Sequence, residues 1–71
     1  MSAFLDFIIR LPDAMDKTFK ITTVDGVAFR IRIFEIPSLE RDWIGIEYPN
    51  KVREFLDPDK VILWRDVTEE K

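Results

Sequence analysis

The stretch Thr18–Phe34, TFKITTVDGVAFRIRIF, decides the fold, because it reads as two β-strands joined by a tight turn. Apolar and polar side chains alternate on both sides of the turn, which is typical of a β-hairpin with one buried face. A two-residue turn would set Ile21 opposite Arg30 on that face. A three-residue loop ending at a left-handed Gly26 pairs Ile21 with Phe29 instead, so the longer loop is predicted.

A short helix is predicted before the hairpin, over Ser2–Leu11. Ser2 is a suitable N-cap, and Pro12 ends the run because proline disfavours helical geometry in the residue before it. Helical spacing predicts one buried stripe with further apolar residues at its edges. The stripe is formed by Leu5, Ile8 and Ile9, and its edges by Phe4 and Leu11.

Three more strands are predicted after the hairpin, at residues 42–48, 51–56 and 60–67. Turns that contain proline separate these strands, at Pro37-Ser38, Pro49-Asn50 and Asp57-Pro58-Asp59. One short helix followed by five short strands indicates a mainly β chain. We therefore expect a strongly bent five-stranded SH3-like barrel that forms one domain over residues 1–71, with a frayed tail at 68–71.

The run VILW at residues 61–64 is apolar at every position, although a strand that covers one core needs apolar residues only at alternate positions. Alternation predicts that Val61 and Leu63 face the barrel interior. Ile62 and Trp64 would then point outward, where the N-terminal helix or another subunit could cover them. An exposed edge strand this apolar favours aggregation unless it is paired, so assembly is the preferred interpretation. The predicted oligomer interface consists of Phe55, Ile62 and Trp64.

The composition excludes several classes of function. The 71 residues include no Cys and no His, so nucleophilic triads and thiolate or imidazole metal sites lack their parts. Asp57 and Asp59 are explained by turn chemistry rather than by Ca²⁺ or Mg²⁺ binding. No apolar run approaches the roughly 20 residues of a membrane span, and the first residues do not resemble a signal peptide. We expect a cytoplasmic protein that is not an enzyme and needs no cofactor.

The helix FLDFIIRL, the hairpin that turns at VDG and the closing FLDPDKVILWRDV together resemble the Sm and Sm-like proteins. The resemblance covers nearly the whole chain and implies a ring in which the fourth strand of each subunit pairs with the fifth strand of its neighbour. Gly26, Glu47 and Asn50 match the first motif of the family approximately. The second motif, apolar-Arg-Gly-x-Asn-Val, reads LDPDKV at residues 56–61. Because Asp57 stands where the family has an RNA-binding Arg, we expect RNA binding to be weak or absent.

A basic group is predicted on the outer face of the hairpin, where Lys20 lies opposite Arg30 and Arg32 follows two residues later. These side chains could contact phosphate or an acidic partner. Glu35 or Glu47 could instead neutralise them across the sheet, because like charges directly opposite one another destabilise it. Neutralisation is the favoured interpretation. The net charge of −3 also lowers the expectation of nucleic-acid binding.

Tyr48, Asn50 and Lys51 form a second candidate group, in the loop that corresponds to the base-contacting loop of the Sm family. An aromatic ring beside an amide can stack on an unpaired base and hydrogen-bond to it. Tyr48 can also end the core face of its strand while Asn50 turns the chain, and this structural role is favoured.

Two classes of function remain. We expect a non-enzymatic Sm-like homo-oligomer that acts as a scaffold. The alternative is an SH3-like adaptor, such as a small phage or host-regulatory inhibitor, that binds a protein partner through Trp43, Tyr48 or the VILW strand. An Sm-like RNA chaperone is a third, disfavoured hypothesis.

Overall fold

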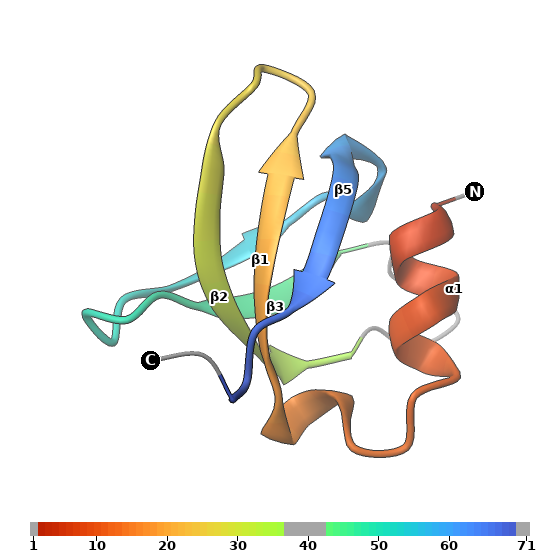
Figure 1. The fold of residues 1–71 in the computed structure, drawn as a ribbon, viewed down its shortest axis with the longest axis vertical. Coiled ribbons are helices and arrows are strands. Elements are labelled where there is room, and N and C mark those ends of the chain that lie inside the picture. The colour runs from red at the N-terminus through yellow and green to blue at the C-terminus, as the bar shows by residue number, and fades with distance from the viewer. Residues whose placement is uncertain (1, 37–42, 70–71) are drawn as a thin grey trace.

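In the computed structural model, which describes residues 2–36 and 43–69, a short helix packs against a five-stranded antiparallel sheet (Figure 1). The mainly β class and the predicted order of one helix and five strands are confirmed. The predicted turn at Pro37-Ser38 lies outside the described residues. None of the helices in the described ranges is long and apolar enough to cross a membrane. The elements are α1 (Ala3–Ile9), the 3₁₀ helix η1 (Ala14–Asp16), β1 (Thr18–Thr23), β2 (Ala28–Glu35), β3 (Ile44–Glu47), β4 (Arg53–Leu56), the 3₁₀ helix η2 (Pro58–Lys60) and β5 (Val61–Asp66).

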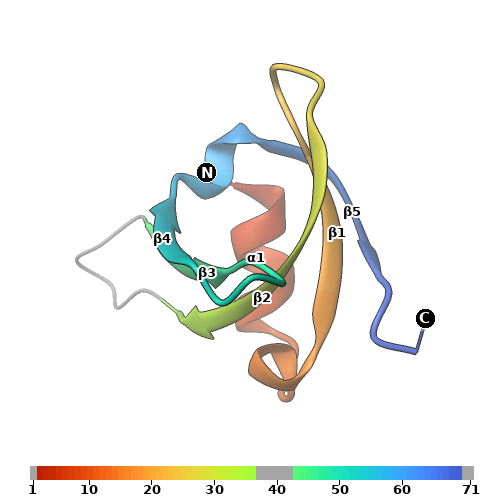
Figure 2. The same cartoon turned by 90° about the vertical axis from the view of Figure 1, so that its left-hand side faces the viewer.

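The strands follow the order β4-β3-β2-β1-β5 in the sheet, so it is open and has β4 and β5 as its two edges. Figure 2 shows how strongly the sheet bends, with β3 and β4 on one side of α1 and β1 and β5 on the other. A β-bulge between Ile33 and Glu35 of β2 accompanies this bend, as expected because bulges increase local twist.

The hairpin has the predicted register. Ile21 pairs with Phe29, and Lys20 pairs with Arg30. The backbone N–H of Thr23 donates to the carbonyl of Val27 over 2.9 Å, which leaves a three-residue loop. Gly26, the last residue of that loop, has a φ of 82°. The left-handed glycine predicted from the alternation pattern is therefore confirmed.

The core lies between α1 and the concave face of the sheet. Phe4 and Ile8 are completely buried, one helical turn apart, and Leu5 is half-buried. Ile9, predicted in the buried stripe, is 56% exposed instead. The helix is rotated so that Phe4 contacts the rings of β1 and β5, which turns Ile9 toward solvent. The buried members of the core are Phe4, Ile8, Ala14, Phe19, Ile21, Ile31, Ile33, Ile44, Ile46 and Val61.

Ser2 caps α1 and ties it to η2. Its hydroxyl oxygen accepts a hydrogen bond from the Leu5 N–H at 3.1 Å, as the N-cap prediction requires, and donates one to the carbonyl of Pro58 at 3.0 Å. An N-cap hydrogen bond is worth about 1 kcal/mol. The same hydroxyl thus fixes the start of α1 and anchors it to the first residue of η2.

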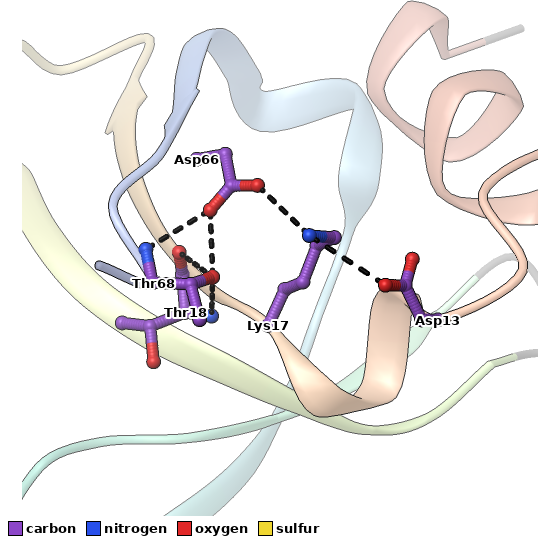
Figure 3. Close-up of polar contacts among 5 residues, drawn as sticks. All are labelled: Asp13, Lys17, Thr18, Asp66 and Thr68. Atoms are coloured by element: carbon purple, nitrogen blue, oxygen red, sulfur yellow. Dashed lines mark hydrogen bonds and ion pairs between the residues drawn. The ribbon is translucent and has the colours of Figure 1, made fainter.

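The end of β5 is tied to the start of β1 through polar contacts (Figure 3). Asp66 accepts hydrogen bonds from the hydroxyl and N–H of Thr68, and lies 3.2 Å from the ammonium of Lys17, which also pairs with Asp13. The pKa of Asp66 is lowered to about 2, mainly by the hydrogen bonds from Thr68 and to a smaller extent by Lys17. Thr68, where the frayed tail was expected to begin, also accepts a hydrogen bond from the N–H of Thr18.

Candidate functional site

A β-bulge at Ile62 changes which faces of β5 are covered. Thr23 pairs with Val61 and Thr22 with Leu63, so Ile62 is an extra residue without its own partner on β1. The residues after the bulge therefore exchange faces. Leu63, predicted inside, is 64% exposed, and Trp64, predicted outside, shares the core face with Ile21. Strict alternation along β5 was the wrong assumption.

Helix α1 covers Trp64. The indole ring lies 5.3 Å from the ring of Phe4 and 5.7 Å from that of Phe7, measured between centroids. Such aromatic pairs add to the stability gained from burial alone. The coverage of the VILW run is therefore divided: the helix accounts for Trp64, whereas Ile62 and Leu63 stay exposed on the edge strand.

The opposite edge strand, β4, also presents an apolar side chain. Phe55 is 53% exposed and packs against the ring of Phe34 at 5.9 Å. The guanidinium of Arg53 lies 4.6 Å from the centre of the Phe34 ring, a cation–π distance. Gly45 makes room for this ring, because a Cβ there would lie 2.8 Å from Phe34 Cζ. Of the predicted interface residues, Phe55 and Ile62 are exposed on opposite edges of the sheet.

The turn between β3 and β4 repeats the geometry of the first hairpin. Tyr48 N–H donates to the carbonyl of Val52, and Lys51 N–H donates to the carbonyl of Tyr48. Lys51 occupies the position equivalent to Gly26 and has a φ of 73°. This conformation strains a residue with a Cβ. No sequence signal indicated it, because Lys rarely marks a left-handed position.

Tyr48 and Asn50 both have structural roles in this turn. The Tyr48 hydroxyl donates to the carboxylate of Glu54, and its ring packs 5.5 Å from that of Phe29. The pKa of Tyr48 is raised to about 12, mainly by burial and secondly by the hydrogen bond to this carboxylate. The Asn50 side-chain oxygen accepts a hydrogen bond from the N–H of Val52. These contacts agree with the structural role favoured for the two residues.

The acidic turn before β5 is also explained locally. The carboxylate of Asp57 accepts a hydrogen bond from the N–H of Asp59 at 3.0 Å and so caps η2, whose first residue is Pro58. This is the turn chemistry that Asp and Pro favour. Within residues 2–36 and 43–69, no group of three or more acidic side chains could hold a metal ion.

The basic residues are more numerous than the hairpin alone predicted. Lys20 of β1 pairs with Arg30 on one side and with Arg65 of β5 on the other. The sequence could not indicate Arg65 because the pairing of β1 with β5 is not local. Of the two acids expected to neutralise the basic group, Glu47 lies opposite Arg32, but its carboxylate is 3.0 Å from the guanidinium of Arg53. Glu35, the other, lies opposite Gly45. That hydrogen bond, more than any other contact, lowers the pKa of Glu47.

The two predicted binding groups meet at one hollow of about 160 Å³ beside the β3–β4 turn. Arg30 and Arg32 line it from β2, and Tyr48 and Lys51 line it from the turn. Asn50 is not among its lining residues. Comparison with protein-family models, curated proteins and solved structures gave no match to this chain.

Proposed function

We propose that the protein is a non-enzymatic Sm-like scaffold that forms a homo-oligomer by pairing β4 of each subunit with β5 of the next. The sheet order is the observation that carries this proposal, because it leaves those two strands as edges. In this arrangement the bent sheet corresponds to an SH3-like barrel, which agrees with the resemblance of the chain to Sm-like proteins.

The energetics of the two edges favour pairing. Each edge strand presents backbone N–H and C=O groups to solvent on its outer side, and such edges recruit other strands unless they are blocked. Ile62 on β5 and Phe55 on β4 are more than half exposed. Full burial of a side chain of this kind is worth about 1.5–3 kcal/mol, so completing the burial of each contributes about half of that. Because β4 and β5 are different surfaces, the contact is head-to-tail, and such a contact gives a ring where the rotation between neighbours closes and a filament where it does not. We propose the ring because the resemblance to Sm-like proteins implies one.

RNA binding is proposed to be weak. Asp57 places a negative charge where the resemblance would require Arg, and its carboxylate is held in the cap of η2. The Tyr48 hydroxyl already donates a hydrogen bond to Glu54, and the Asn50 side-chain oxygen already accepts one from the N–H of Val52. Uridine- and adenine-rich oligomers are therefore expected to bind poorly at near-physiological salt. Tight binding that is lost in Tyr48→Ala would contradict this and favour an RNA chaperone.

A matched pair of substitutions tests the interface. Ile62→Lys introduces a charge on β5, and Ile9→Lys makes the same change on α1 at a residue of similar exposure. We expect Ile62→Lys to give a folded monomer by circular dichroism and light scattering, and Ile9→Lys to keep the oligomer. An Ile62→Lys protein that remains oligomeric would place the interface elsewhere.

The second candidate function is a monomeric or dimeric SH3-like adaptor that binds a protein partner. The observation in its favour is Trp43, a large ring that is 52% exposed just before β3. An exposed Trp is a frequent anchor for protein partners. A monomeric wild-type protein whose binding partner is lost on Trp43→Ala would support this alternative over the scaffold.

A further inference from the structure

The convex face of the sheet, opposite the core, collects basic side chains from four strands. Arg65, Lys20 and Arg30 stand next to one another across β5, β1 and β2. Residues that pair directly across strands share a face, so this is a continuous row. Arg32 follows Arg30 two residues along β2, and Arg53 lies on β4. We refer to Lys20, Arg30, Arg32, Lys51, Arg53 and Arg65 as the cationic face.

This face has a charge opposite to the rest of the chain. It contains six of the 11 Lys and Arg residues, and two acidic residues, Glu35 and Glu47, lie on the same side of the sheet. Its formal charge is therefore +4, whereas the remaining five basic and 12 acidic residues of the sequence carry −7. A protein with a net charge of −3 thus concentrates its positive charge on one side of a sheet. Such a field attracts an acidic partner and orients it on approach.

Two hollows lie along the cationic face, and both combine cations with apolar walls. The first is the hollow beside the β3–β4 turn, where the apolar Ile31 and Pro49 and the acidic Glu47 accompany three basic residues. The second, of about 240 Å³, is lined by Lys20, Arg65 and the exposed Leu63. A ligand that fits both hollows needs negative charges and apolar groups in alternation.

We propose that the cationic face binds an acidic, partly apolar segment of another protein, laid across β5, β1 and β2. Carboxylates of that segment pair with Lys20 and Arg32, and its apolar side chains contact Leu63. Guanidinium groups suit carboxylates because they can donate two parallel hydrogen bonds. The face stays open in a monomer and in an oligomer joined through β4 and β5, so this inference does not depend on the proposed function.

A peptide fits the observations better than a nucleic acid does. Stacking on exposed aromatic rings supplies much of the affinity for single strands, but the Tyr48 ring beside the first hollow packs on Phe29. Apolar walls formed by Leu63 and Pro49 also contribute nothing to a phosphate backbone. A long polyanion would extend beyond the face onto acidic surface, whereas a short acidic segment matches its extent.

Lys51 supplies independent support. Its backbone has a left-handed conformation, which is strained in any residue that has a Cβ. Glycine would adopt the same conformation in this turn without strain. Strain of this kind is concentrated at functional sites. Its charged side chain is at the wall of the first hollow, so the strained residue is one that a carboxylate ligand would use.

Fluorescence anisotropy with labelled probes tests the proposal. The probes are a peptide of alternating Glu and Leu, the same peptide with Gln in place of Glu, and a uridine oligomer. We expect the Glu peptide to bind, with affinity that falls as salt is raised, and the other two probes to bind at least about tenfold more weakly. Lys20→Glu and Arg32→Glu should each weaken the Glu peptide at least about fivefold, because each reverses a charge that faces the ligand.

Arg10→Glu is the matched control, since it makes the same charge change on an exposed residue of the α1 end. The proposal is supported if the affinity for the Glu peptide is unchanged in Arg10→Glu and reduced in Arg32→Glu. Both variants should give the same circular dichroism spectrum as the wild type. Equal losses in the two variants would show an effect of net charge and overturn it. Binding of the uridine oligomer at least as tight as that of the Glu peptide, or no binding of the Glu peptide, would also overturn it.

Discussion

The two hairpin turns allow a quantitative prediction of the free energy of unfolding, because they share one geometry and differ in the residue at the left-handed position. Gly26 occupies it in the first turn and Lys51 in the second, with φ values of 82° and 73°. A residue with a Cβ pays about 1–2 kcal/mol for this conformation. Glycine avoids that strain but loses about 0.5–1 kcal/mol more through backbone entropy. Exchanging the residue types should therefore change stability in opposite directions.

Lys51→Gly is expected to raise the free energy of unfolding by about 0.5–1 kcal/mol, the difference between relieved strain and added entropy. Gly26→Val should lower it by about 1–2 kcal/mol even after the entropy gain, because a β-branched side chain is strained more than Lys at positive φ. A Cβ at Gly26 would meet no atom within 4 Å, so its cost is backbone strain and not a clash. Asp25→Ala, which removes the hydrogen bond from the Thr23 hydroxyl, should cost less than Gly26→Val.

Urea unfolding followed by tryptophan fluorescence measures these differences in the free energy of unfolding. In a separate thermal melt, each 1 kcal/mol should shift the midpoint temperature by about 4–8 °C. Lys51→Ala is the control for Lys51→Gly, because it removes the charge and keeps the strained conformation. It should leave stability nearly unchanged. A Lys51→Gly protein no more stable than Lys51→Ala, or a Gly26→Val protein as stable as the wild type, would refute the turn geometry.

Three further predictions concern titration and packing. Tyr48 is the single tyrosine of the chain, so absorbance near 295 nm should report a midpoint close to pH 12, and Glu54→Gln should lower that midpoint toward 10. Because the pKa of Asp66 is lowered from 3.8 to about 2, its contribution to stability is present above pH 4 and is lost as the pH falls to 2. Asp66→Asn should therefore be less stable at pH 7 and lose less stability over that range; equal losses would count against the contacts of Asp66. Gly45→Ala should destabilise by about 1–3 kcal/mol in urea unfolding, since its Cβ would overlap the ring of Phe34, and a neutral effect would contradict that close approach.

Local patterns in the sequence were sufficient to predict the first hairpin. Alternation of apolar residues fixed the pairing of Ile21 with Phe29, and only glycine accepts the left-handed position at low cost. The N-cap at Ser2 was predictable for the same reason, because one side chain supplies a bond that the helix start needs. In both cases the decisive interaction joins residues close together in the chain.

The errors arose where distant segments determine the structure. The bulge at Ile62 depends on how β5 meets β1, and it exchanges the faces of Leu63 and Trp64. The rotation of α1 that exposes Ile9 depends on the rings which Phe4 meets in the core. The place of Arg65 beside Lys20 likewise follows from a strand pairing that no local pattern contains.

Native mass spectrometry of the wild-type protein tests the proposed pairing of β4 with β5 between subunits. We expect a single closed oligomer whose mass is an integral multiple of one chain, stable on dilution through the micromolar range. A protein that has the mass of one chain throughout that range would contradict it.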